Sequence, residues 1–210
     1  MYNIPYFKAS EQGEVIHFMK EHPFITLCGC DKDGKPAATH IPVLTELRDD
    51  KLFLLGHVMR KQQHTKTFHM NKNVLAIFYG AHTYVSASWY AKKDEASTWN
   101  YQAVHAKGIL NFLDDEALHK FLIRLTEKFE NNPGSPSLVQ KMDEHYVRNL
   151  MKAIVAIEIE VTSVEHVFKL SQNRDEKSFE NIIAHLNQQD EDAKLVAGEM
   201  EKRKHKIFPK

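Results

Sequence analysis

Strand-like segments that follow one another through short turns constrain the fold of this chain most strongly. Residues 24–30, 36–43 and 51–57 are rich in β-forming side chains. The Asp33-Gly34 pair between the first two predicts a tight hairpin turn, in which both residues supply positive φ angles. Strands and helices do not alternate regularly, which disfavours a doubly wound parallel sheet. We therefore expect a mainly β (α+β) fold, with an antiparallel barrel or strongly curved sheet and peripheral helices.

Three later segments add strands to this sheet. Residues 73–79 are apolar throughout, which predicts a strand buried on both faces. Residues 98–113 form a long strand-like run, and residues 154–164 alternate as a half-buried antiparallel strand does. Pro42 cannot donate to a ladder, so its strand lies at an edge or carries a bulge. Barrel closure would remove the exposed edges that so many strands leave.

Helices are predicted between and after the strands. Asp114-Asp115 are good N-cap residues for a helix over residues 115–130, and Ser10 is the expected N-cap of a first helix. The predicted helices cover residues 10–22, 61–71, 115–130, 176–187 and 190–204. We expect residues 1–170 to form the barrel domain, and residues 171–210 a helical segment packed on it that ends in a basic tail.

The charge balance limits the classes of partner. Lys and Arg together number 28, as do Asp and Glu, so the formal net charge is zero. Dedicated nucleic-acid binders usually carry a positive excess. No apolar stretch approaches the roughly 18 residues that span a bilayer, and no signal peptide is evident. We expect a cytoplasmic protein without a membrane partner.

Cysteine and histidine usage indicates no metal site. Cys28 and Cys30 have no partner pair, and buried free thiols are the simpler interpretation. The 13 histidines form no H-E-x-x-H or H-x-H pair. A zinc site built from distant histidines is the alternative.

A phosphate group would have to be held by side chains, because the chain has no P-loop and no G-x-G-x-x-G motif. Arg60-Lys61 follow directly on the predicted strand that contains His57. Two adjacent cations at a strand end can bind a phosphate dianion. The alternative is the solvated start of a helix, although cations are disfavoured at a helix N-terminus.

Two further patches indicate a ligand site. Aromatic rings beside short polar side chains suit a planar heteroaromatic ligand, or else a barrel-end cluster or an oligomer interface. The residues concerned are Ser86, Ser88, Trp89, Tyr90, Trp99 and Asn100. In residues 169–174, Lys169 and Gln172 can satisfy phosphate, ribityl or carbonyl acceptors. A helix-capping turn explains that segment equally well.

Motifs along nearly the whole chain resemble the PaiB family, described as FMN-binding negative transcriptional regulators. They are His-Pro-Phe at 22–24, Ala-Thr-His-Ile-Pro at 38–42, Gly-His at 56–57, Ala-Ile-Phe-Tyr-Gly at 76–80, Tyr-Val-Ser-Ala-Ser-Trp-Tyr at 84–90, Thr-Trp-Asn-Tyr-Gln-Ala-Val-His-Ala at 98–106 and Lys-Leu-Ser-Gln-Asn-Arg at 169–174. The resemblance covers residues 1 to about 200.

This resemblance implies an antiparallel split β-barrel of the pyridoxamine-phosphate-oxidase-like type. It implies a homodimer with FMN near the subunit interface, and a cytoplasmic repressor of protease production and sporulation. It also implies that Arg60-Lys61 hold the flavin phosphate, although Met59 stands where the wider class has serine. By the same analogy, Thr39, His40 and Ile41 lie along the isoalloxazine edge, and Trp89, Tyr90, Trp99 and Asn100 match the family's motifs.

Alternative functions follow from the same residues. A flavin-dependent oxidoreductase would need an acid or base, for which His40, His57 and Tyr101 are candidates. A haem-binding split barrel is a third hypothesis, given the histidines. If the protein regulates transcription, the partner is DNA or another regulatory protein. The basic run at 202–206 would then contact phosphates, unless it is a frayed, solvated tail.

Overall fold

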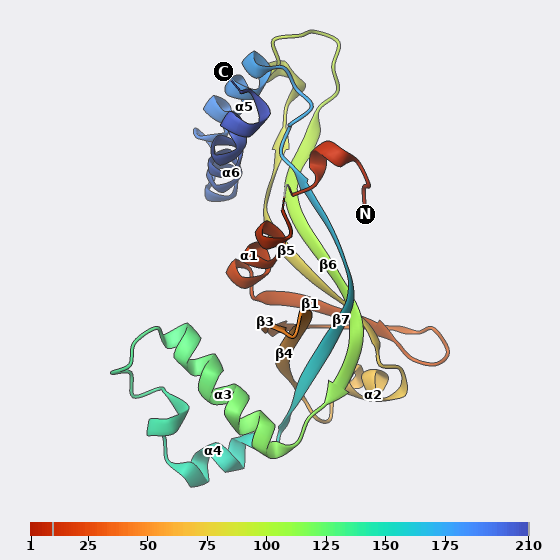
Figure 1. Cartoon of the computed structure of the whole chain (residues 1–210), viewed down its shortest axis with the longest axis vertical. Helices are drawn as coiled ribbons and strands as arrows, with labels where there is room; N and C mark the ends of the chain where they lie inside the picture. Colours follow the sequence, from red (N-terminus) through yellow and green to blue (C-terminus); the bar gives the residue numbers. More distant parts are fainter. Residues whose placement is uncertain (10, 210) are drawn as a thin grey trace. The chain divides into compact units, whose positions relative to one another are not determined.

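The computed structural model describes residues 1–9 and 11–209. Its elements in chain order are η1 (Pro5–Phe7), α1 (Gln12–Glu21), β1 (Phe24–Cys30), β2 (Pro36–Pro42), β3 (Leu44–Arg48), β4 (Lys51–Met59), α2 (Gln63–Met70), β5 (Asn73–Val85), η2 (Ala87–Trp89), β6 (Thr98–Phe112), α3 (Asp115–Glu130), η3 (Val139–Lys141), α4 (Glu144–Met151), β7 (Ile154–Lys169), α5 (Glu176–Leu186) and α6 (Glu191–Ile207) (Figure 1). The proposed N-cap Ser10 lies outside the described residues.

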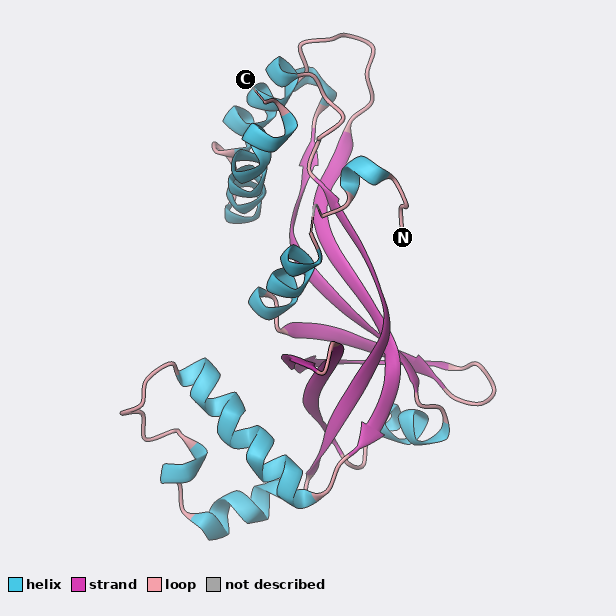
Figure 2. Cartoon of the chain, in the orientation of Figure 1, coloured by secondary structure: helices cyan, strands magenta, loops and turns pink. Residues whose placement is uncertain are grey.

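The strands form one seven-stranded sheet in the order β2-β1-β5-β6-β7-β4-β3. β1 pairs antiparallel with β2 and β5, and β4 pairs antiparallel with β3 and β7. Helices flank the strands, as Figure 2 shows. This arrangement confirms the predicted antiparallel, mainly β class with peripheral helices. Pro42 lies in β2 at the sheet edge, where its missing N–H costs no ladder bond.

The chain divides into two compact units. Unit 1 contains Met1–Val15, Tyr79–Val104 and Glu165–Lys210, and unit 2 contains Ile16–Phe78 and His105–Val164. The long strands β5, β6 and β7 each contribute residues to both units. The predicted barrel and C-terminal domains, divided at residue 170, stay a prediction.

The β1–β2 turn is built by Asp31 and Gly34. The Asp31 carboxylate accepts hydrogen bonds of 2.9 Å from the backbone N–H groups of Asp33 and Lys35. Gly34 has φ +79°, which a glycine adopts without steric cost. The prediction that Asp33 shares this positive φ was wrong, because the Asx-type hydrogen bonds leave only one left-handed residue. A second hairpin joins β3 to β4 through Asp49 and Asp50, both with positive φ.

Burial along β5 differs from the sequence prediction. Val74, Ala76 and Phe78 are buried, whereas Leu75 and Ile77 are half-buried and Tyr79 is exposed. The strand therefore alternates, as an antiparallel strand with one covered face does. The prediction of burial on both faces was wrong, because an apolar composition does not distinguish a covered face from an uncovered one.

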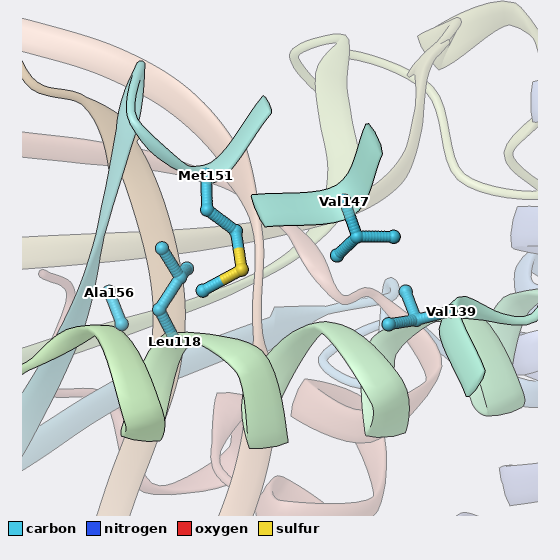
Figure 3. Packing of buried hydrophobic residues seen from close by; sticks show 5 residues of the cluster. All are labelled: Leu118, Val139, Val147, Met151 and Ala156. Atoms are coloured by element: carbon cyan, nitrogen blue, oxygen red, sulfur yellow. The ribbon is translucent and has the colours of Figure 1, made fainter. Parts of the chain in front are cut away.

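Helices α3 and α4 share a small core within unit 2. It consists of Leu118, Val139, Val147, Met151 and Ala156, whose side chains converge in Figure 3. The predicted start of α3 is confirmed, because the Asp114 carboxylate accepts a 2.8 Å hydrogen bond from the N–H of Ala117.

Helix α6 includes the basic run at 202–206, for which a frayed, solvated tail was one of the two interpretations. Lys202 pairs with Glu199 at 2.7 Å, Arg203 with Glu14 and Glu199, and Lys204 with Glu180 at 2.5 Å. These three cations are therefore neutralised within unit 1. In residues 1–9 and 11–209, no helix combines the length and apolar character needed to cross a membrane.

Candidate functional site

The predicted site residues lie in both units. Unit 2 contains Thr39, His40, Ile41, His57, Arg60 and Lys61. Unit 1 contains Ser86, Ser88, Trp89, Tyr90, Trp99, Asn100, Lys169 and Gln172.

Two cations precede an uncapped helix in unit 2. Arg60 and Lys61 follow β4, and α2 begins two residues later at Gln63. The N-cap residue Gln62 makes no side-chain capping hydrogen bond. Thr65 fixes the connection, because its hydroxyl donates a 2.7 Å hydrogen bond to the carbonyl of Met59. The N–H groups of a first helical turn, the positive end of the helix dipole and neighbouring cations are groups that can bind an anion in proteins.

Arg60 has an acidic partner that the sequence interpretation missed. Its Nη2 atom lies 2.5 Å from Oδ1 of Asp115, the first residue of α3. Its backbone N–H donates a 2.9 Å hydrogen bond to the carbonyl of Ala153. Because the two charged residues are 55 positions apart in the sequence, no local pattern predicts their contact.

The segment Thr39-His40-Ile41 lies on edge strand β2, and its side chains are divided between the two faces. Thr39 is half-buried and Ile41 is buried, whereas His40 is exposed on the opposite face beside Phe24. Ile41 packs close to Gly56 of β4, where a Cβ would lie 3.1 Å from Ile41 Cδ1. Glycine at position 56 thus permits β2 to approach the strand that carries His57.

His57 has a buried nitrogen available for a ligand. Its Nδ1 atom has no hydrogen-bond partner among the described residues, and its ring lies 5.8 Å from that of Phe121. Burial lowers the pKa of His57 below 6.5, so the imidazole is neutral at pH 7. A neutral imidazole can donate to or accept from an uncharged polar edge of a ring system.

Exposed aromatic rings lie on the parts of β5 and β6 that belong to unit 1. The ring of His82 lies 4.9 Å from Tyr79 and 6.1 Å from Trp99, which also meets Tyr84 at 6.1 Å. Tyr79, Tyr84 and Trp99 are each about half exposed. Burial, together with Tyr2 and Tyr79, raises the pKa of the neighbouring Tyr101, which keeps its hydroxyl protonated at neutral pH.

Asn100 and Gln172 are committed to internal hydrogen bonds. Asn100 is fully buried, and its Oδ1 accepts a 3.0 Å hydrogen bond from the hydroxyl of Ser171. The Gln172 side chain accepts from the N–H of Leu170 at 2.7 Å and donates to the carbonyl of Phe168. In this structure both residues shape the turn after β7.

Lys169 and Arg174 bring positive charge to the same turn. The Lys169 ammonium donates to the Thr98 hydroxyl and, at 2.9 Å, to the carbonyl of Trp99. Burial is the main cause that lowers the pKa of Lys169, and the positive charge of Arg174 lowers it further. Arg174 pairs with Glu95, and its guanidinium lies 4.2 Å from the centroid of the Tyr90 ring. Arg174 belongs to the recognised motif, but the sequence interpretation did not place it in the site.

The remaining predicted residues of unit 1 surround η2. The Ser86 side chain caps this turn by accepting from the N–H of Ser88, and the two hydroxyls lie 2.8 Å apart. The Trp89 ring stacks on His185 of α5 at 5.0 Å. Both serines and Trp89 thus have local structural partners.

Metal-ligating side chains do not converge in the described part of the chain. No group of three or more His, Cys, Asp or Glu residues there has a geometry that could hold an ion. Cys28 and Cys30 are free thiols, and burial raises the pKa of Cys28.

Sequence comparison finds two kinds of match. A family model described as "Putative FMN-binding domain" matches residues 1–163. The chain is 36% identical over 202 residues to the "Protease synthase and sporulation protein PAI 2" of Bacillus subtilis, which covers 96% of this chain and 97% of that protein.

Structure comparison identifies the fold. The "FAD and Heme binding protein" of Mycobacterium smegmatis has a TM-score of 0.57 at 15% identity and covers 77% of this chain and 72% of that one. A conserved hypothetical protein of Mycobacterium tuberculosis has a TM-score of 0.54 at 15% identity, with 78% and 88% covered. The predicted antiparallel split barrel is confirmed.

Proposed function

The chain belongs to this FMN-binding family, so FMN is its cofactor, and from that premise we propose that it is a homodimeric negative regulator of transcription. We further propose that the phosphate of FMN binds at the N-terminus of α2, beside Arg60 and Lys61. The name of the Bacillus subtilis relative associates that protein with protease synthesis and sporulation. We propose the same processes for this chain.

One observation carries the phosphate site: two cations directly precede a helix whose N-terminus lacks a side-chain cap. A phosphate there would satisfy free N–H groups and lie at the positive end of the helix dipole. Each charge-assisted hydrogen bond contributes about 1.5–3 kcal/mol. The arrangement also compensates for Met59, since backbone N–H groups can supply the donors that a serine would have provided.

The ring of the flavin needs an apolar surface and a few polar contacts. In unit 2, Thr39, Ile41 and the free nitrogen of His57 have the required chemistry. We propose Thr39, Ile41 and His57 as contacts of the ring. For unit 1 we keep the proposal that the sequence motifs support, in which the cofactor contacts are Ser86, Ser88, Trp89, Tyr90, Trp99, Asn100, Lys169 and Gln172.

The phosphate site is tested by comparing FMN with riboflavin, which lacks the phosphate. Fluorescence titration of the Arg60→Gln and Lys61→Gln variants should show at least about tenfold weaker FMN binding and unchanged riboflavin binding. Lys66→Gln, an exposed lysine on α2, is the matched control and should bind both ligands as the wild type does. Equal loss of both ligands, or no loss of FMN, would refute the phosphate site.

Exposed apolar side chains on the strands support the homodimer. Phe24 in unit 2 is 65% exposed, and Trp99 in unit 1 is 53% exposed. Apolar side chains of this size are common at subunit interfaces. Light scattering should give the mass of a dimer, and Phe24→Glu should weaken the dimer whereas Leu195→Glu on α6 should not. A monomeric wild type at micromolar concentration with FMN bound would contradict the proposal.

The regulatory role must operate without an excess of positive charge. The net charge is zero, and Lys202, Arg203 and Lys204 are already ion-paired. A second regulatory protein that supplies the DNA contact is therefore the partner that the charges favour. A gel-shift assay should show no shift with the purified protein alone at physiological salt. A specific shift would instead establish direct DNA binding.

A further inference from the structure

The ion pair between Arg60 and Asp115 bears directly on the proposed phosphate site. The Arg60 guanidinium has five N–H donors, of which at least one is directed to Asp115. The side chain of Arg60 is 37% exposed and that of Asp115 is 74% exposed. A phosphate could reach Arg60 from solvent, where it would meet the carboxylate of Asp115 beside the guanidinium.

Asp115 is distinguished from the two acidic residues next to it. Asp114 accepts from the N–H of Ala117 as the N-cap of α3, and Glu116 pairs with Lys120 at 2.7 Å. Of these three carboxylates, the one paired with Arg60 is that of Asp115.

Helix stability alone does not account for this contact. An acidic residue in the first turn of α3 interacts favourably with the helix dipole. Asp114 and Glu116 already supply that interaction. The charge at position 115 therefore has a second effect, which is to neutralise one of the two cations before α2.

We propose that Asp115 determines phosphate selectivity by competing with the phosphate of FMN for Arg60. This inference rests on the proposed phosphate site. The carboxylate of Asp115 pairs with the guanidinium of Arg60, and a phosphate that binds there has to share or displace it. Asp115 thus lowers the affinity for FMN relative to riboflavin.

The test measures the dissociation constants of FMN and riboflavin for three variants by flavin fluorescence. Asp115→Asn should tighten FMN binding by about two- to fivefold, the range expected for one exposed charge pair, and should leave riboflavin unchanged. Asp115→Glu, which keeps the charge, should bind FMN nearly as the wild type does. Glu116→Gln removes a charge from the same helical turn without touching Arg60, and should change neither constant.

The Arg60→Gln variant distinguishes failure of the proposed phosphate site from failure of the proposed role of Asp115. If Arg60→Gln leaves the ratio of the two affinities unchanged, the phosphate site is refuted and the role of Asp115 with it. If Arg60→Gln lowers the ratio but Asp115→Asn does not raise it, only the role of Asp115 is refuted. The role of Asp115 would also be overturned if Asp115→Asn tightened FMN binding equally in the wild type and in the Arg60→Gln variant. Repulsion between the Asp115 carboxylate and the phosphate would then explain the effect without Arg60.

Discussion

The hydroxyl of Ser171 donates a 3.0 Å hydrogen bond to the buried amide oxygen of Asn100, and so ties the turn after β7 to β6. Ser171 has φ +62°, a left-handed conformation that is uncommon for residues with a Cβ. Both residues belong to unit 1. The bond holds the turn in the conformation that carries Lys169, Gln172 and Arg174.

Ser171→Ala should destabilise the protein by about 1–3 kcal/mol, because it leaves the buried oxygen of Asn100 without this donor. Denaturant unfolding measures the loss. Ser88→Ala is the matched control, since Ser88 is exposed and its removal should cost less than about 0.5 kcal/mol. Equal stability of the two variants would show that the bond to Asn100 contributes nothing.

Gly108 allows β6 to lie against β7. A Cβ at this position would lie 2.5 Å from the carbonyl oxygen of Glu160 and 2.6 Å from Cγ2 of Ile159. Gly108→Ala should therefore destabilise by several kcal/mol or prevent folding, as overpacking against backbone does. Gly198→Ala in α6 meets open space and should stabilise by about 0.5–1 kcal/mol. Thermal melting of the two variants checks whether the melting temperature falls for Gly108→Ala and rises for Gly198→Ala. A folded Gly108→Ala variant of unchanged stability would contradict the prediction for Gly108.

The neutral state of His57 predicts a loss of stability in acid. Burial lowers its folded-state pKa, whereas in the unfolded chain the pKa is about 6.5. Below pH 6.5 the unfolded state takes up the proton first, so the free energy of unfolding falls as pH drops, until the folded pKa is reached. Above pH 6.5 both states are neutral and this contribution is constant.

Unfolding titrations between pH 8 and pH 5 measure this loss. His57→Gln should show a shallower decrease than the wild type. His64 and His166 have pKa values lowered mainly by burial, and they add to the slope in both proteins. Identical slopes for the wild type and His57→Gln would rule out His57 as a source.

The cations at the end of α6 should act on stability. Arg203→Gln removes ion pairs to Glu14 and Glu199 whose side chains are about one quarter exposed, and should cost about 1–3 kcal/mol. Lys206→Gln, an exposed position on the same helix, should cost less than about 0.5 kcal/mol. Chemical denaturation compares them. If Arg203→Gln is as stable as Lys206→Gln, the basic run is a solvated helix end after all.

Local patterns were enough to predict most elements. The bounds of β1, the N-cap at Asp114 and the edge position of Pro42 follow from β-propensity, capping and the missing proline N–H. These features depend on residues a few positions apart. β3 was missed because it is short and follows Pro42 after a single residue. Helix α4 was missed although it has a local signal, since the Asp143 carboxylate caps it by accepting a 2.8 Å hydrogen bond from the N–H of Tyr146.

The candidate site residues were only partly predictable. Arg60 and Lys61 could be proposed because adjacent cations at a strand end are visible in the sequence. The partner Asp115, the orphan nitrogen of His57 and the bond from Ser171 to Asn100 were not found. Each depends on groups that tertiary packing brings together. Packing also determines whether a strand face is covered, as the alternating burial of β5 shows.

By itself the sequence determined the antiparallel class, the order of the main elements, the family and its cofactor, because propensities, turns and motifs are local. Only the tertiary structure decided which charges are free and which are already neutralised. Arg60 and the cations of α6 look alike in the sequence as basic residues near helices. Their electrostatic effect depends on carboxylates that are distant along the chain, since Coulomb energy depends on separation in space and on exposure to solvent.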